Sequence, residues 1–187
     1  AHALEEAKPW EQGQLLRVIA GQDPDRFLEA LNASFEAGRT DTRAWGIFLG
    51  HTDGDTSDHR MRSTAAALSA HTDADLEAMA SEVCWWLLRQ YDRLETAKRP
   101  WPAKLDQLVQ RLAGLQFPET SASLVSILES DRAILSSPAG NLTSIAVREV
   151  VRRTPGESAR KNKALGRLRR LVSAGGEPGT IALAVCA

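Results

Sequence analysis

The sequence predicts an all-α fold, an irregular array of about eight or nine helices that can stack in pairs as an α-solenoid. Three observations indicate this class. Apolar residues recur at helical spacing, strict alternation of apolar and polar residues is absent, and the breaks between apolar stretches are short. The chain has 187 residues, 43% of them hydrophobic, so it can bury a core, and it contains no linker long enough to separate two domains. Residues 1–187 are therefore expected to form a single helical domain.

The clearest helix start lies in residues 23–38, "DPDRFLEALNASFEAG". Asp23 can cap the helix, Pro24 fits the first helical position, and Gly38 supplies a stop at the other end. Four apolar residues then fall on one face of the expected helix: Phe27, Leu28, Leu31 and Phe35.

Two further helices are expected before residue 71. The first follows Asp41 and ends at Gly50, and its apolar residues recur at helical spacing. The second covers residues 60–70, "RMRSTAAALSA", whose small side chains suit close packing against a neighbouring helix. The shared apolar face of the first is formed by Trp45, Phe48 and Leu49.

The strongest helical signal begins at Thr72. Thr72 and Asp75 form the S/T-x-x-D/E pattern that opens a helix, and an apolar stripe continues for about twenty residues. Pro100 and Pro102 in "KRPWP" cannot lie inside a helix and therefore end it. One continuous helix is expected, with a stripe of Leu76, Met79, Val83, Leu87 and Leu94.

The C-terminal half predicts four more helices. One ends at Gly114, one covers residues 117–130, and one begins with Ser137 as cap and Pro138 at its first position. The last is basic and precedes "SAGGEPG", which has the composition of a connector. The expected apolar positions are Leu105, Leu108, Val109, Leu112, Leu124, Ile127, Leu128, Leu142, Ile145, Ala146, Val150, Leu165, Leu168 and Val172.

The densest group of possible metal ligands is "HTDGDTSDH", from His51 to His59. Histidine nitrogens and aspartate oxygens could bind a metal there. The stretch lacks the spacing of a calcium loop and of the zinc motifs H-E-x-x-H and H-x-E with C-x-x-C. Its Asp and Gly residues favour a solvated turn, with Ser57 or Asp58 as the cap of the next helix. We therefore expect no metal, and an enzyme built on this stretch ranks last among the three interpretations.

Charge is balanced overall but not along the chain. The sequence holds 23 Lys and Arg against 24 Asp and Glu, yet residues 148–170 hold nine basic residues and two acidic ones. That segment carries +7, so the remainder carries −8 of the total −1. The basic residues either form a solvated helix face that meets an acidic surface of the same chain or of a neighbouring domain, or they contact nucleic-acid phosphates. The first interpretation is favoured, because charge runs are more often solvated or intramolecular than nucleic-acid sites. The predicted contact residues are Arg160, Lys161, Lys163, Arg167, Arg169 and Arg170.

No motif indicates catalysis or a cofactor. The patterns G-x-S-x-G, GxxxxGK[ST] and GxGxxG are absent, and the glycines of residues 174–179 lack the Lys of a phosphate loop. Cys84 lies among apolar residues and is expected to be structural, while adjacent Trp85 and Trp86 point about 100° apart, so at least one should reach a helix interface. With no secretory signal and no run of about 18 apolar residues, a reduced cytoplasmic setting is expected.

The ends of the chain predict a piece of a longer polypeptide. The sequence begins at Ala1 without Met and stops in the apolar run "TIALAVCA". Residues 134–151, "ILSSPAGNLTSIAVREVV", resemble a helix start found in helical regions that follow sirtuin-like domains in large bacterial proteins. The downstream "LRRLVSAGGEPGTIALAVCA" and the upstream "LEAMASEVCWWLLRQYDRL" are similar to neighbouring helices of those regions.

The resemblance implies an irregular helical array within a multidomain protein of the kind associated with defence against phage. Any NAD-hydrolysing or nucleotide-binding centre would lie outside these residues. The expected function is a non-catalytic scaffold or recognition region that contacts other domains of the same polypeptide or a protein partner. The alternative is a nucleic-acid-binding helical subunit that uses residues 148–170.

Overall fold

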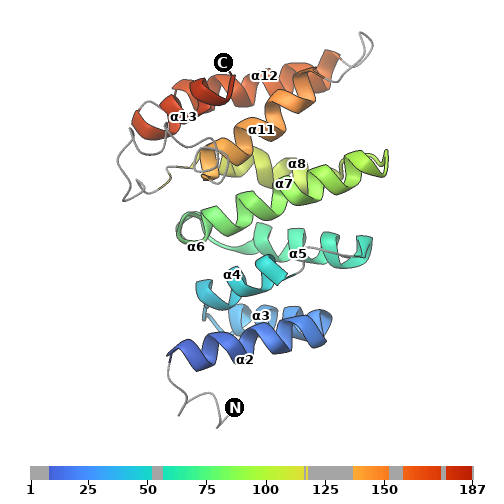
Figure 1. Ribbon diagram of the computed structural model, residues 1–187, viewed down its shortest axis with the longest axis vertical. Coiled ribbons are helices and arrows are strands. Elements are labelled where there is room, and N and C mark those ends of the chain that lie inside the picture. The colour runs from blue at the N-terminus through green and yellow to red at the C-terminus, as the bar shows by residue number, and fades with distance from the viewer. Residues whose placement is uncertain are drawn as a thin grey trace.

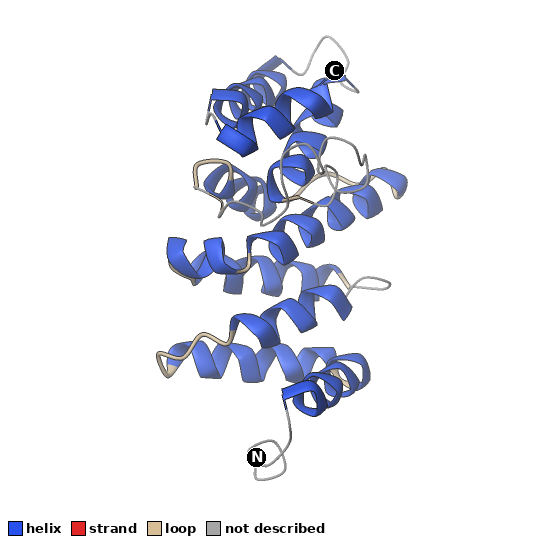
Figure 2. Cartoon of the chain, turned by 60° about the vertical axis from the view of Figure 1, so that its left-hand side comes forward, coloured by secondary structure: helices blue, strands red, loops and turns tan. Residues whose placement is uncertain are grey.

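The computed structural model describes residues 9–51, 57–115, 117, 137–151, 158–173 and 176–186. This part of the chain contains ten helices and no strand, which confirms the all-α class (Figure 2). The helices are α2 (Pro9–Gln22), α3 (Pro24–Glu36), α4 (Thr42–His51), α5 (Asp58–Ala70), α6 (Asp73–Ala78), α7 (Ala80–Thr96), α8 (Ala103–Leu112), α11 (Pro138–Val151), α12 (Ser158–Ser173) and α13 (Gly176–Cys186).

The helices are stacked one above another across the long axis of the molecule, with α2 at one end and α12 and α13 at the other (Figure 1). One row of contacts runs from α2 to α4, from α4 to α7 and from α7 to α11. A second row runs from α3 to α5 and from α5 to α8, and α12 and α13 pack on α11. The described helices therefore form the two-layered stack of an α-solenoid.

Local capping explains where several helices begin. Asp23 Oδ1 accepts a hydrogen bond from the Arg26 amide at 3.1 Å, and the Ser57 hydroxyl accepts one from the Arg60 amide at 3.2 Å. Thr72 and Asp75 form a reciprocal capping box, because each side chain accepts from the other's backbone amide. The caps predicted at Asp23, Ser57 and Thr72 are thus confirmed.

The structure corrects two predictions of secondary structure and adds one helix, α2, that the sequence analysis does not predict. The single helix expected from Thr72 is divided, because the backbone bends at Met79 (φ −120°, ψ 23°) between α6 and α7. The expected connector "SAGGEPG" contains the start of α13, where Pro178 occupies the first turn that tolerates proline. The helix expected in residues 117–130 lies outside the described residues, apart from residue 117.

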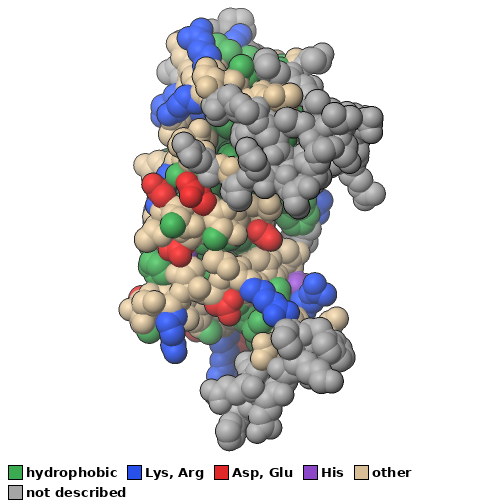
Figure 3. Space-filling model, turned by 90° about the vertical axis from the view of Figure 1, so that its left-hand side faces the viewer, with side chains coloured by type: hydrophobic (Ala, Val, Ile, Leu, Met, Phe, Trp, Pro, Cys, Tyr) green, Lys and Arg blue, Asp and Glu red, His purple; other side chains and the backbone are tan. Residues whose placement is uncertain are grey.

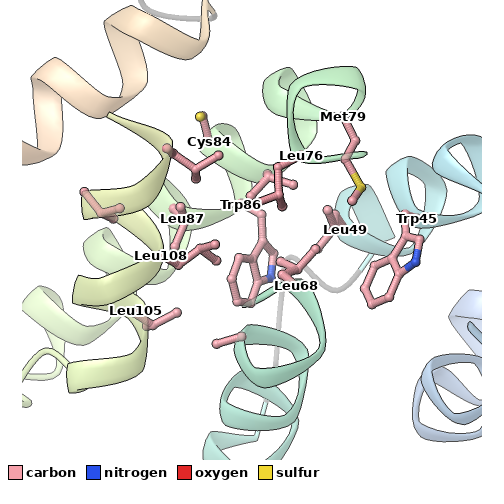
Figure 4. Close-up of a cluster of buried hydrophobic side chains, with 14 of the residues drawn as sticks. Trp45, Leu49, Leu68, Leu76, Met79, Cys84, Trp86, Leu87, Leu105 and Leu108 are labelled. Atoms are coloured by element: carbon pink, nitrogen blue, oxygen red, sulfur yellow. The ribbon is translucent and has the colours of Figure 1, made fainter. Parts of the chain in front are cut away.

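The core runs through the middle of the stack. Trp86 of α7 is fully buried and lies between Leu68 of α5 and Leu108 of α8, whereas Trp85 is only half-buried (Figure 4). This confirms that one of the two adjacent tryptophans reaches a helix interface. The predicted apolar face of α4 is also buried, at Trp45, Phe48 and Leu49.

Arginine–aspartate pairs tie successive helices together at the edge of this core. Arg60 of α5 donates to Asp25 of α3 through Nε (2.6 Å) and Nη2 (2.9 Å), and the Arg60 hydrogen bond lowers the pKa of Asp25. Arg111 of α8 pairs with Asp73. It also donates hydrogen bonds to the backbone carbonyls of Ser69 and His71, which lie at the C-terminal end of α5. Further pairs join Arg99 to Asp58 and Arg148 to Asp92.

Candidate functional site

The opening stretch from His51 to His59 is divided between two helices. His51 ends α4, residues 52–56 lie outside the described residues, and His59 is exposed in the first turn of α5. Asp58 is engaged by Arg99, whose Nη1 lies 2.7 Å from Asp58 Oδ1. Among the residues that the structure describes, no three His, Cys, Asp or Glu side chains come together in a way that could hold a metal ion.

The basic segment turns partly inward. Arg167 of α12 is only 1% exposed, and its Nη2 lies 2.8 Å from Asp106 Oδ1 of α8 and 2.9 Å from Glu149 Oε2 of α11. Lys163, one turn earlier, lies 3.8 Å from Asp106 Oδ2, and Arg148 pairs with Asp92 of α7. Helix α12 is therefore held against α8 and α11 by a buried ion cluster.

This cluster corrects one of the six predicted contact residues. Arg167 cannot meet a partner, because its guanidinium is buried among carboxylates of the same chain. The side chains of Lys161, Arg169 and Arg170 are exposed, and the side chain of Arg160 lies outside the described residues. Figure 3 shows acidic side chains at mid-height of one face and Lys and Arg side chains toward its top and lower end, and the described side chains of that face form no continuous basic patch.

A recess lies elsewhere, along the row formed by α2, α4 and α7. It has a volume of about 510 Å³, within the range of ligand-binding clefts. A second recess of about 310 Å³ adjoins it, because both are lined by Gly50 and Glu82. We call the two together the α2–α4–α7 groove, lined by Gly13, Arg17, Thr42, Arg43, Gly46, Ile47, Gly50, His51, Ser81, Glu82 and Trp85.

Glycines form part of the floor of this groove. A β-carbon at Gly13 would come within 2.8 Å of Arg43 Nη2, so the missing side chain gives the Arg43 guanidinium its place. A β-carbon at Gly46 would lie 3.2 Å from Glu82 Cγ, whereas one at Gly50 would meet no atom within 4 Å. Gly46 and Gly50 are four residues apart, so they lie on the same face of α4.

The charged side chains of the groove are mostly basic. Its described lining residues include Arg17 and Arg43, one acidic residue, Glu82, and the imidazole of His51, and most of the described residues that line the larger recess are exposed to solvent. The smaller recess adds the half-buried indole of Trp85, over which the Arg89 guanidinium lies 5.3 Å from the ring centroid. The groove can thus offer hydrogen-bond donors to an anionic group and an aromatic surface to an apolar one.

Sequence reasoning missed this groove. The i, i+4 spacing of Gly46 and Gly50 within an expected helix is a signal that could have indicated a small-residue face, but Gly50 was interpreted only as a helix stop. The contribution of Glu82 and Trp85 depends on how α7 packs on α4, which no local pattern specifies. Cys84, next to them on α7, is fully buried, and burial raises the pKa of its thiol, as expected for a structural cysteine.

Comparison of the chain with protein-family models, with curated proteins and with solved structures finds no match. Within the described residues, no helix has both the length and the apolar character that crossing a membrane requires.

Proposed function

We propose that this chain is a non-catalytic helical scaffold or recognition region that contacts other domains of its own polypeptide or a protein partner. The observation that carries the proposal is the inward pairing of the basic segment. Arg148, Lys163 and Arg167 pair with Asp92, Asp106 and Glu149 of the same chain, which leaves fewer cations for nucleic-acid phosphates. The resemblance to helical regions that accompany sirtuin-like domains supports the same role.

The architecture supports protein contact as well. A stack of helices buries its core between successive layers and leaves long outer faces exposed to solvent. Proteins of this kind use those faces to bind other proteins. Here the outer surface carries an open groove. One face presents acidic side chains at mid-height and basic side chains toward its ends (Figure 3). A region of this type would act by positioning a partner.

A salt titration tests the proposal against the nucleic-acid alternative. Fluorescent single- and double-stranded oligonucleotides are titrated with the wild-type chain and with a variant carrying Lys161→Gln, Arg169→Gln and Arg170→Gln. Arg167 is left intact because it is structural. We expect only weak binding at about 150 mM salt. A plot of log binding constant against log salt concentration should be much less steep than three phosphate contacts, at about −0.9 each, would give. Sub-micromolar binding that the variant abolishes would replace the proposal with the alternative.

Photo-crosslinking provides the positive test. A photoreactive phenylalanine is placed at Gly50 in the groove or at exposed Arg170 on α12, and the chain is irradiated in the cells that naturally produce it. A scaffold region should yield discrete protein adducts that survive nuclease treatment. Adducts that nuclease removes, or none at either position, would contradict a role in protein contact.

A further inference from the structure

The outer side of α2 carries an apolar stripe that no described helix covers. Leu15, Val18 and Ile19 are 42%, 53% and 42% exposed, and they are three of the four large apolar side chains that are exposed in the described part of the chain. Their spacing of i, i+3 and i+4 places them together on one side of the helix. Apolar side chains gathered in this way on a surface indicate a contact site.

The same helix already buries its other side in the stack. Gly13 and Ala20 are buried and Leu16 packs on the core, on the side where α2 contacts α4. The centre of this buried side lies roughly 140° around the helix from the stripe. Helices α4 and α7 likewise contact neighbours on two sides. Helix α2 therefore has the residues of an internal helix although it lies at one end of the described stack, where a polar outer side is the usual arrangement (Figure 1).

We propose that this stripe binds the same stripe of a second copy of the chain, with the two α2 helices antiparallel about a two-fold axis between Leu15 and Ile19. A two-fold contact brings one surface against itself, so that surface must be complementary to itself. The described side chains of the stripe are aliphatic, and those that border it at Gln14 and Gln22 are uncharged. The inference concerns a surface that the proposed function does not use.

The antiparallel arrangement gives each side chain of the stripe an apolar neighbour. Centred on the stripe, it places Leu15 of each copy beside Ile19 of the other and brings the two Val18 side chains close to the axis. Residues before 13 extend past the end of the partner's helix, so the contact is confined to the stripe and its borders. The two helix dipoles run in opposite directions, which favours this orientation over a parallel one.

The contact is small, so the dimer should be weak. Helix α2 has 14 residues, and one pair of helices of that length covers less than the roughly 1,200 Å² that stable interfaces bury. We therefore expect a dissociation constant on the order of 100 μM, as in transient contacts. Because the contact is apolar, screening of charges by salt should not dissociate it.

Sedimentation equilibrium tests the inference. Between about 10 μM and 1 mM, the chain should show a reversible monomer–dimer equilibrium that persists in about 1 M NaCl. Val18→Lys places a charge near the axis, where two copies would have to bury it, so it should weaken dimerisation by about tenfold or more. Gln107→Lys is the matched control, because it adds the same charge at an exposed position of α8 and should leave the equilibrium unchanged.

A cysteine at position 18 tests the orientation of the two helices. Exposed Cys186 is first replaced by serine, and buried Cys84 is kept. In that background Val18→Cys should form a disulfide between two copies on mild oxidation, because residues close to a two-fold axis come within the reach of a disulfide. Gln107→Cys in the same background should remain monomeric.

Three results would overturn the proposal. A chain that stays monomeric at about 1 mM would mean that the stripe has a different partner or none. A dimer that NaCl dissociates, or that Val18→Lys leaves intact, would place the contact on another surface. Failure of Val18→Cys to form the disulfide would exclude the arrangement even if Val18→Lys were to unfold, which circular dichroism and thermal melting would detect.

Discussion

Replacing Arg167 with Met should be among the most destabilising single changes in this chain. Arg167 lies between Asp106 and Glu149, at 2.8 and 2.9 Å, and both Arg167 and Glu149 are only 1% exposed. Without the guanidinium, the Glu149 carboxylate is left buried next to another carboxylate. Removing one partner of a buried ion pair costs about 3–5 kcal/mol, a large part of the total stability of a domain.

Most of this free-energy cost should come from the Glu149 carboxylate. The Asp106 side chain is 22% exposed and has Lys163 within 3.8 Å, so it can keep part of its hydration and a cation. Glu149, by contrast, is only 1% exposed, so its carboxylate keeps almost no contact with water when the Arg167 guanidinium is removed. Among the described residues, the Nε and Nη1 atoms of Arg167 have no hydrogen-bond partner. Replacing both charges with apolar residues should therefore recover much of the loss.

Urea unfolding followed by circular dichroism measures the effect. Arg167→Met should lower the midpoint strongly at constant slope, and adding Glu149→Leu should restore stability by about 1–3 kcal/mol of coupling. The matched control is Arg169→Met on the same helix, which is exposed and should change stability by less than about 0.5 kcal/mol. A loss at Arg167 below about 1 kcal/mol, or strictly additive losses in the double variant, would refute the reasoning.

Three further predictions concern helix ends, glycines and thiols. Thr72→Ala should lower the free energy of unfolding by about 0.5–2 kcal/mol, because it removes the capping box. The Thr72 hydrogen bond lowers the pKa of Asp75, so its contribution to stability is present above the ordinary carboxyl pKa of 3.8 and is lost as the pH falls through the lowered pKa. Urea unfolding at pH 7 and pH 3 should therefore show a smaller difference between variant and wild type at pH 3. Gly166→Ala should stabilise the folded chain by about 0.5–1 kcal/mol, because the added β-carbon meets no atom within 4 Å. Gly179→Ala should destabilise it, because the added β-carbon would lie 2.8 Å from the Val172 carbonyl oxygen. Equal melting temperatures of the two variants would contradict this packing of α12 on α13. In a titration with a thiol reagent, exposed Cys186 should react in the native protein, and buried Cys84 should react only after denaturation. Burial both shields the Cys84 thiol and raises its pKa. Prompt reaction of both thiols in the native protein would show that Cys84 is not buried.

Local chemistry made most of the helices predictable from sequence. Caps such as Asp23 and Thr72, and the prolines after α7, act within a few residues, so their effect can be read without knowing the fold. The division at Met79 could not be found in this way, because the apolar stripe from Leu76 to Val83 continues across it. Helix α2 escaped prediction because exposed apolar residues hide its helical period: Leu15, Val18 and Ile19.

The candidate site was beyond local patterns for a different reason. Arg167 and Asp106 are 61 residues apart in the sequence, so their pairing depends on how α12 lies on α8. The charge imbalance correctly suggested that the basic segment meets acidic residues, but it could not say which arginine turns inward. In the same way, Gly46 becomes part of a groove only because Glu82 of α7 passes close to it.

The stacking of the helices also has a mechanical consequence. Each helix of a row contacts its neighbours in that row. Small rotations at successive interfaces therefore add up along the molecule, so that the stack as a whole can bend or extend. The Arg60–Asp25 and Arg148–Asp92 pairs bridge separate steps and stiffen them, and salt screening would soften both.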